Sequence, residues 1–165
     1  MKIRPERAED AAAIRAILVS AFAASAEAEL VERLRCDGDL ALALVADQDG
    51  ELCGYVAFPK LVVEDAGRIS DAIGLAPVAV MPDRQRLGVG GALIREGHRL
   101  LAERGASLIF VLGDPDYYAR FGYNLDAAAP FESIYAGSHF MALRLMQGAP
   151  RGGKVRYPAA FAQIA

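Results

Sequence analysis

Two kinds of hydrophobic spacing alternate along the chain and divide it into helical and extended segments. After an extended stretch at residues 2–4, the apolar side chains of residues 11–24 recur at the spacing of one helix face: Ile14, Ile17, Leu18, Ala21 and Phe22. Residues 27–38 repeat this spacing, and Gly38 is placed to end the helix. The first forty residues therefore predict one short strand followed by two amphipathic helices.

The pattern then becomes extended. Residues 40–47 and 52–65 are apolar stretches joined by a short turn that contains Asp49-Gly50, a dipeptide typical of hairpins. Residues 71–80 add a third long strand. We expect these three strands to form an antiparallel meander.

Helical spacing returns at Gly90 and ends at Gly105, with Arg95, His98 and Arg99 on the polar face. His98 is therefore expected in solvent. The nearly continuous apolar run that follows predicts a strand buried on both faces. A strand, a crossover helix and a second strand in this order imply a parallel pair, because such a connection needs a dozen or more residues.

The last third of the chain predicts shorter elements. A short helix is expected at residues 114–121, a loop at 124–130, and strands at 139–146 and 154–158. The sequence contains no internal repeat, low-complexity stretch or linker, so residues 1–165 predict a single domain of mixed α+β class.

Composition narrows the classes of function. The 165 residues carry a net charge of −3 without a basic run, which disfavours nucleic acid as a partner. The charged N-terminus and the lack of a long apolar run favour a cytoplasmic protein that neither enters nor binds a membrane. Cys36 and Cys53 lack metal-ligand spacing, so we expect no metal and place both cysteines in or near the core.

A glycine-rich stretch separates the third strand from the crossover helix. Three glycines lie at the start of that helix: Gly88, Gly90 and Gly91. Backbone N–H groups at a helix start lack intrahelical partners, and glycines let a ligand approach them closely. Arg84 and Arg86 add positive charge. The stretch therefore predicts a cradle for an anion.

Two common nucleotide motifs do not fit. A dinucleotide-binding G-x-G-x-x-G would need glycine at position 93, which is Leu93. A P-loop needs Ser or Thr after Gly-Lys, whereas Gly153-Lys154 is followed by Val155. The anion is therefore not expected to be NAD or ATP.

Three short motifs follow one another in this half of the chain: Val78-Ala79-Val80-Met81-Pro82, Gln85-Arg86-Leu87-Gly88-Val89-Gly90 and Tyr118-Ala119-Arg120-Phe121-Gly122-Tyr123. Their order and spacing resemble the V-x-V-x-P, Q/R-x-x-G-x-G/A and Y-x-x-x-G-F motifs of the GNAT N-acetyltransferase superfamily. The resemblance implies a central, mostly antiparallel twisted sheet with one parallel, splayed strand pair and helices on both faces.

The resemblance also implies acetyl-CoA as the cofactor. Its pyrophosphate would lie on the glycine loop, its pantetheine arm along the backbone of Val78 and Val80, and Leu112 and Gly113 would form the other wall. The residues expected to bind it are Val78, Ala79, Val80, Gln85, Arg86, Leu87, Gly88, Val89, Gly90, Gly91, Leu112, Gly113, Asp114, Tyr117 and Phe121.

The family's general acid corresponds to Tyr118, which would protonate the departing thiolate. Asp114 is placed to cap the short helix, with Pro115 in its first turn. Many family members have Asn where this chain has Asp114, and Phe where it has Tyr123, so contacts around the acid are expected to differ.

The sequence does not single out the residue that would take the amine's proton or those that would bind the acceptor. Asp71, Asp114 and Glu132 are candidates for the base, each with an alternative as a cap, turn or surface carboxylate. Acidic side chains in the segments that wall the acceptor site in this family could attract a cationic amine: Glu27, Glu29, Asp126 and Glu132.

The expected reaction is transfer of acetyl from acetyl-CoA to a primary amine of a small molecule or peptide, by a monomer or homodimer. Two alternatives remain at this point. One is a non-catalytic acyl-CoA sensor that keeps the cradle, and the other is an unrelated α+β protein whose glycine loop only makes a tight turn.

Overall fold

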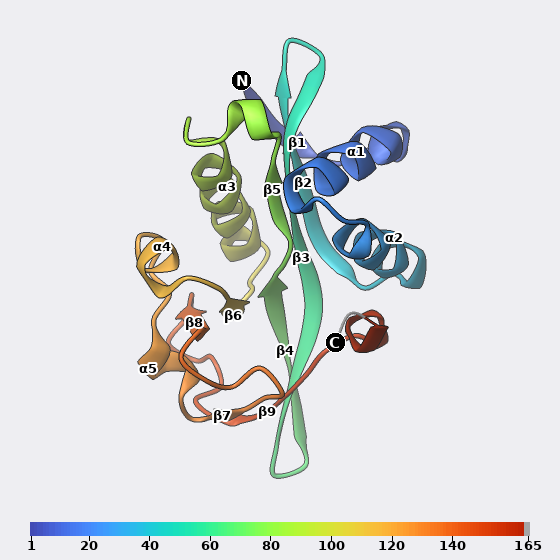
Figure 1. Cartoon of the computed structure of the whole chain (residues 1–165). Helices are drawn as coiled ribbons and strands as arrows, with labels where there is room; N and C mark the ends of the chain where they lie inside the picture. Colours follow the sequence, from blue (N-terminus) through green and yellow to red (C-terminus); the bar gives the residue numbers. More distant parts are fainter. Residues whose placement is uncertain (164–165) are drawn as a thin grey trace.

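A strongly twisted sheet separates two helical layers (Figure 1). The computed structural model describes residues 1–163. The helices are α1 (Ala11–Phe22), α2 (Ala26–Asp37), α3 (Val89–Glu103), α4 (Pro115–Ala119) and α5 (Leu125–Ala128), with 3-10 turns η1 (Ala8–Asp10), η2 (Pro82–Arg84) and η3 (Ala159–Gln163). The strands are β1 (Lys2–Pro5), β2 (Leu40–Gln48), β3 (Glu51–Asp65), β4 (Arg68–Leu75), β5 (Val78–Val80), β6 (Leu108–Leu112), β7 (Phe131–Glu132), β8 (Phe140–Arg144) and β9 (Gly153–Arg156).

The sheet has the order β1-β2-β3-β4-β6-β8, with β5 and β9 also paired to β3. β2, β3 and β4 form the expected antiparallel meander. Asp49 and Gly50 connect β2 to β3 with φ values of 55° and 88°, the left-handed pair that a type I′ hairpin turn requires. The hairpin predicted from this dipeptide is confirmed.

β4 and β6 form the predicted parallel pair, with Ile73 opposite Ile109 and Leu75 opposite Val111. Beyond Leu75 the two strands separate, because Ala76 and Pro77 both face Ala57 of β3 in a bulge. After the bulge, β5 pairs with β3, and no pairing with β6 occurs in the described residues. The stretch expected as one strand at 71–80 is therefore two strands, and the bulge produces the splay.

Each face of the sheet packs against different helices. Alternate residues of β2 and β3 point to opposite faces, as the two-residue period of a strand dictates. Between one face and α3 lies an apolar cluster that includes Leu42, Leu44, Val56, Phe58 and Ile109 of the sheet and Leu93 and Ile94 of α3. Between the other face and α1 and α2 lies a cluster that includes Ala43, Val45 and Ala57 of the sheet and Ile14, Ile17, Leu18 and Val31 of the helices. The helices of both layers are thus fixed to the same two central strands.

Three expectations need correction. Residues 124–130, expected as a loop, contain α5, whose first N–H groups are capped by the side chain of Asn124. Cys53 is buried as expected, but Cys36 lies exposed on α2. His98 is half-buried rather than solvated, because its ring packs between Phe58 and Tyr123.

The chain described here contains no helix that is both long and apolar enough to cross a membrane.

Candidate functional site

The glycine loop forms a cradle at the N-terminus of α3. Gly88 caps the helix with φ of 88°, and Arg86 also has a left-handed φ of 65°. This winding turns the loop so that backbone N–H groups at the helix start remain unpaired within the helix. The side-chain amide of Gln85 donates to the carbonyl oxygen of Val80 at 3.0 Å, which ties the loop to β5.

A groove of about 690 Å³ lies over this loop. It is lined by Val78, Val80, Arg84, Gln85, Arg86, Gly88, Val89, Gly90, Gly91, Tyr117 and Arg120. Three arginines therefore line the groove at the helix start, where the helix dipole already favours an anion. Arg120 was not predicted from the sequence, because it reaches the groove from α4, with its guanidinium 4.9 Å from the centre of the Tyr117 ring.

Within the described residues, the edge of β5 that faces away from β3 pairs with no other strand and lies beside the groove, with the Val80 carbonyl oxygen accepting from Gln85. The carbonyl of Pro77 and the N–H of Met81 bond to β3 at 3.0 and 2.9 Å. Successive residues of a strand direct their backbone groups to opposite sides, so those of Val78 and Val80 face away from β3. Ala79, by contrast, is opposite Tyr55 in the β3 pairing and its side chain is buried under α1, so the structure does not bring it to the groove.

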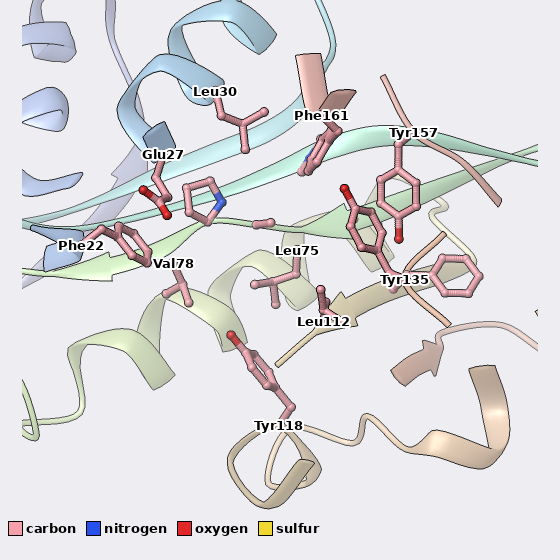
Figure 2. Close-up of a pocket in the computed structure, with 15 residues that line it drawn as sticks. Phe22, Glu27, Leu30, Leu75, Val78, Leu112, Tyr118, Tyr135, Tyr157 and Phe161 are labelled. Carbon is pink, nitrogen blue, oxygen red and sulfur yellow. The ribbon is translucent and has the colours of Figure 1, made fainter. Parts of the chain in front are cut away.

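A second cavity, of about 290 Å³, lies where β4 and β6 separate (Figure 2). It is lined by Phe22, Glu27, Leu30, Pro59, Gly74, Leu75, Ala76, Pro77, Val78, Phe110, Leu112, Tyr118, Tyr135, Tyr157 and Phe161. Val78 lines both this cavity and the groove over the glycine loop. The two spaces therefore adjoin at Val78 of β5.

Neighbouring tyrosines of α4 face the two spaces. Tyr117 lines the glycine groove, whereas Tyr118 directs its hydroxyl into the second cavity (Figure 2). The side chain of Asp114 accepts from the N–H of Asp116 at 3.1 Å, which starts α4 as expected. The step of about 100° per residue in a helix explains why the two rings diverge.

The Tyr118 ring is held by packing on two sides. It lies over Gly113, where a Cβ would overlap the ring, and meets Tyr123 edge-to-face with centroids 5.9 Å apart. Burial, with a smaller contribution from neighbouring Tyr117, raises the pKa of Tyr118 to about 12. The phenol is therefore protonated at neutral pH, as a proton donor must be.

Tyr123 is itself anchored by α3, on the same side of the sheet. The hydroxyl of Tyr123 is 2.8 Å from Nε2 of His98, and the Tyr123 ring is fully buried. Burial, with the nearby Arg95 charge, lowers the pKa of His98 to about 4. The neutral imidazole of His98 thus pairs with the hydroxyl of Tyr123, a group that the Phe usual at this position in the family would lack.

The remaining residues predicted to bind the cofactor occupy different places. Leu112 lies half-exposed in the second cavity, and Gly113 supports the Tyr118 ring. Leu87 is 71% exposed on the loop. Phe121 is buried behind Gly91 and meets Tyr117 edge-to-face, so it supports the groove without lining it.

The candidate carboxylates differ in whether they line the cavity that contains the Tyr118 hydroxyl. Asp71, Asp114 and Glu132 do not line the cavity that contains the Tyr118 hydroxyl, and neither do Glu29 and Asp126. Glu27 does line it. The sequence named Glu27 only as one of four acidic side chains, because nothing local to α2 indicates that it meets α4.

An anion cradle, a strand edge without a neighbouring strand and a buried phenol in two adjoining spaces define an acyltransferase that uses an acyl-CoA. The family profile described as acetyltransferase (GNAT) domain matches residues 2–125. The chain belongs to the GNAT acetyltransferase family.

Relatives match this sequence over nearly all of its length. Over 162 residues the sequence is 40% identical to the uncharacterized N-acetyltransferase YhbS of Escherichia coli K12, covering 95% of this chain and 96% of YhbS. The crystal structure of Escherichia coli YhbS in complex with CoA matches with a TM-score of 0.90 and 37% identity, over 99% of this chain and 93% of that one. A GNAT acetyltransferase from Brucella melitensis in complex with acetyl-CoA matches with a TM-score of 0.82 and 38% identity, over 97% of both chains.

Proposed function

We propose that this enzyme transfers the acetyl group of acetyl-CoA to a primary amine, with Tyr118 as the general acid. The observation that carries the proposal is that Val78 lines both spaces, one of which holds the anion cradle and the other the Tyr118 hydroxyl. The crystal complexes of the Escherichia coli and Brucella melitensis proteins with CoA and acetyl-CoA support the choice of cosubstrate.

Each part of acetyl-CoA has a chemical counterpart along this path. The pyrophosphate binds the N–H groups of the glycine loop and the flanking guanidiniums. The amides of the pantetheine arm pair with the backbone of Val78 and Val80 as an added strand would. The thioester then enters the space between β5 and β6, beside Tyr118.

The reaction needs one nucleophile and one proton donor. The neutral amine attacks the thioester carbonyl carbon, so that a C–N bond forms and the C–S bond breaks. The sulfur takes a proton from the Tyr118 hydroxyl, and the proton that the nitrogen sheds restores the phenol. Amine and thioester thus give amide and thiol with every proton accounted for.

The first test is thermal stabilisation of the protein by acetyl-CoA, with NAD and ATP as controls at equal concentration. A ligand that binds only the folded state raises the melting temperature, and a hundredfold excess over Kd adds about 2.7 kcal/mol. We expect a shift with acetyl-CoA alone. Equal shifts with all three ligands, or none, would contradict the assignment of the cradle.

Thiol release over a panel of primary amines then separates an enzyme from an acyl-CoA sensor. Turnover with one class of amine supports the transferase, whereas saturable binding of acetyl-CoA without turnover supports the sensor. The cytoplasmic location and the monomeric or homodimeric state stay predictions.

A further inference from the structure

Glu27 projects into the cavity from the side opposite Tyr118 (Figure 2). It lies in the first turn of α2, whose N-terminal end adjoins the end of α1 at Phe22. Among the side chains that the structure describes, residues 1–162, Oε2 of Glu27 is the only buried nitrogen or oxygen without a hydrogen-bond partner. The protein thus buries one carboxylate oxygen at the cavity wall, and no group in these residues donates a hydrogen bond to it.

An unpaired buried carboxylate is costly, because it has lost water and gained no partner. Nearby carboxylates on α2 avoid that cost. Glu29 accepts from the Ser25 hydroxyl at 3.2 Å, and Glu32 pairs with Arg15 at 2.7 Å. Glu27 therefore differs from its neighbours in a way that a cationic ligand in the cavity would explain.

The rest of the cavity is apolar and largely aromatic. Tyr135 and Tyr157 meet edge-to-face with centroids 4.8 Å apart, and Tyr157 meets Phe161 at 5.3 Å. Phe22 adds a further ring from the end of α1. Among the described residues that line this cavity, Glu27 is the only charged one. The walls match a ligand with one positive charge and an apolar body.

We propose that Glu27 binds the ammonium group of a small amine whose body is apolar and about the size of one ring, and that it takes the proton that makes this nitrogen a nucleophile. This inference rests on the proposed acetyl transfer and names its acceptor and base. The carboxylate comes from α2, and not from any of the three positions that the sequence suggested for the base.

The proton transfer follows from the place of Glu27 on the cavity wall, where its carboxylate is available to an ammonium group bound in that cavity. The ammonium gives one proton to Glu27, and the lone pair attacks the thioester carbon to form the C–N bond. The C–S bond then breaks as Tyr118 protonates the departing sulfur, and the second proton lost by the nitrogen restores the Tyr118 phenol. Glu27 then releases its proton to solvent.

Size and charge restrict the acceptor. A cavity of about 290 Å³ is at the small end for ligand sites, and it also has to receive the thioester end of the cosubstrate. A polyamine would place its second ammonium against aromatic or aliphatic walls without a counter-ion. A single-charge amine avoids that penalty, and its apolar body gains from burial against the rings.

The test compares 2-phenylethylamine with 2-phenylethanol, which has the same body and no charge. Both are titrated calorimetrically into CoA-loaded protein. We expect the native protein to prefer the amine by at least about tenfold, the range expected for a buried charge pair. Glu27→Gln should abolish that preference while keeping the affinity for the alcohol, which shows that the cavity is intact.

Glu29→Gln is the matched control, because it removes the same charge from the same helix outside the cavity. It should keep the preference for the amine. The inference is overturned if the Glu27→Gln protein also prefers the amine, or if the Glu29→Gln protein loses that preference to the same extent. It is likewise overturned if the CoA-loaded native protein binds neither compound.

Turnover with acetyl-CoA separates this inference from the proposed function. Glu27-dependent amine binding without thiol release would contradict the transferase and leave the amine site standing. If spermidine or a lysine peptide causes thiol release at equal rates in the native and Glu27→Gln proteins, the transferase is supported and the assigned acceptor is overturned. Release with 2-phenylethylamine that falls at least about tenfold in Glu27→Gln supports both.

Discussion

Two adjacent tyrosines divide the work of the site between them. Tyr118 faces the cavity where the thioester would react, and Tyr117 faces the groove over the glycine loop, where its hydroxyl lies 3.1 Å from the position of a Cβ on Gly90. The same substitution at each position should therefore change different kinetic constants.

Tyr118→Phe removes the proposed proton donor and keeps the ring that lines the cavity. We expect kcat to fall by about a hundredfold or more, with Kd for acetyl-CoA within about twofold of the native value. Tyr117→Phe should show the reverse split, a raised KM for acetyl-CoA with kcat largely kept. Steady-state kinetics of thiol release measures both, and an unchanged kcat in Tyr118→Phe would rule out the general acid.

Gly113→Ala tests how Tyr118 is positioned. A Cβ at residue 113 would overlap the Tyr118 ring, so the ring must move while its hydroxyl is retained. We expect kcat to fall by about tenfold, because small displacements of a catalytic group are costly. Gly148→Ala is the control, since a Cβ there meets no atom within 4 Å. Equal kcat values for the two variants would contradict the positioning role.

At the scale of elements, the bulge at Ala76 and Pro77 turns β5 away from β6 and opens the sheet. The two cavities are placed by that separation, with α4 covering one end and the C-terminal turn η3 the other. η3 packs on α2 through Ala160 and Phe161. The wall of the proposed acceptor cavity is therefore also a stabilising contact between distant parts of the chain.

Phe161→Ala should affect both stability and acceptor binding. Removing a buried ring leaves a void and lowers the free energy of unfolding by about 3 kcal/mol, measured by urea denaturation. The KM for the amine should rise by about tenfold, because the ring lines the cavity. The thermal shift produced by acetyl-CoA should be kept, since Phe161 does not line the glycine groove. Loss of that shift would show that the effect is not confined to the acceptor end.

At the scale of the whole molecule, stability should depend on a buried histidine. The pKa of His98 falls from 6.5 to about 4 on folding, so the unfolded chain binds the proton more strongly. Stability is therefore full above pH 6.5 and decreases as the pH falls toward 4. Allowing for solvent screening of the partly exposed ring, the loss is about 2 kcal/mol.

His98→Gln should flatten this dependence, because the amide can still pair with Tyr123 but does not titrate in this range. Urea unfolding between pH 7 and pH 4 measures the slope. A steep slope that persists in the variant would assign it to other groups. Asp10 is one such group, because the Arg4 guanidinium, which donates to it at 2.8 Å, lowers the pKa of this carboxyl.

Much of the site was accessible from the sequence because it is local. The glycine loop, the capped start of α4 and the Asp49-Gly50 turn each depend on backbone preferences within a few residues. The period of apolar residues likewise predicted the order of the main helices and strands. α5 was missed because four residues give too little period to detect, although the Asn124 cap was a signal.

Tertiary structure decided what is brought together. Three features of the site bring together segments that are far apart in the sequence. Glu27 shares a cavity with Tyr118, Arg120 borders the anion cradle, and His98 contacts Tyr123. Such contacts depend on how both helical layers pack on one sheet and on where a bulge splits a strand, and no local pattern contains that information. The sequence by itself thus determined the family motifs, the cradle and the order of elements, whereas only packing selected which carboxylate faces the reacting atoms.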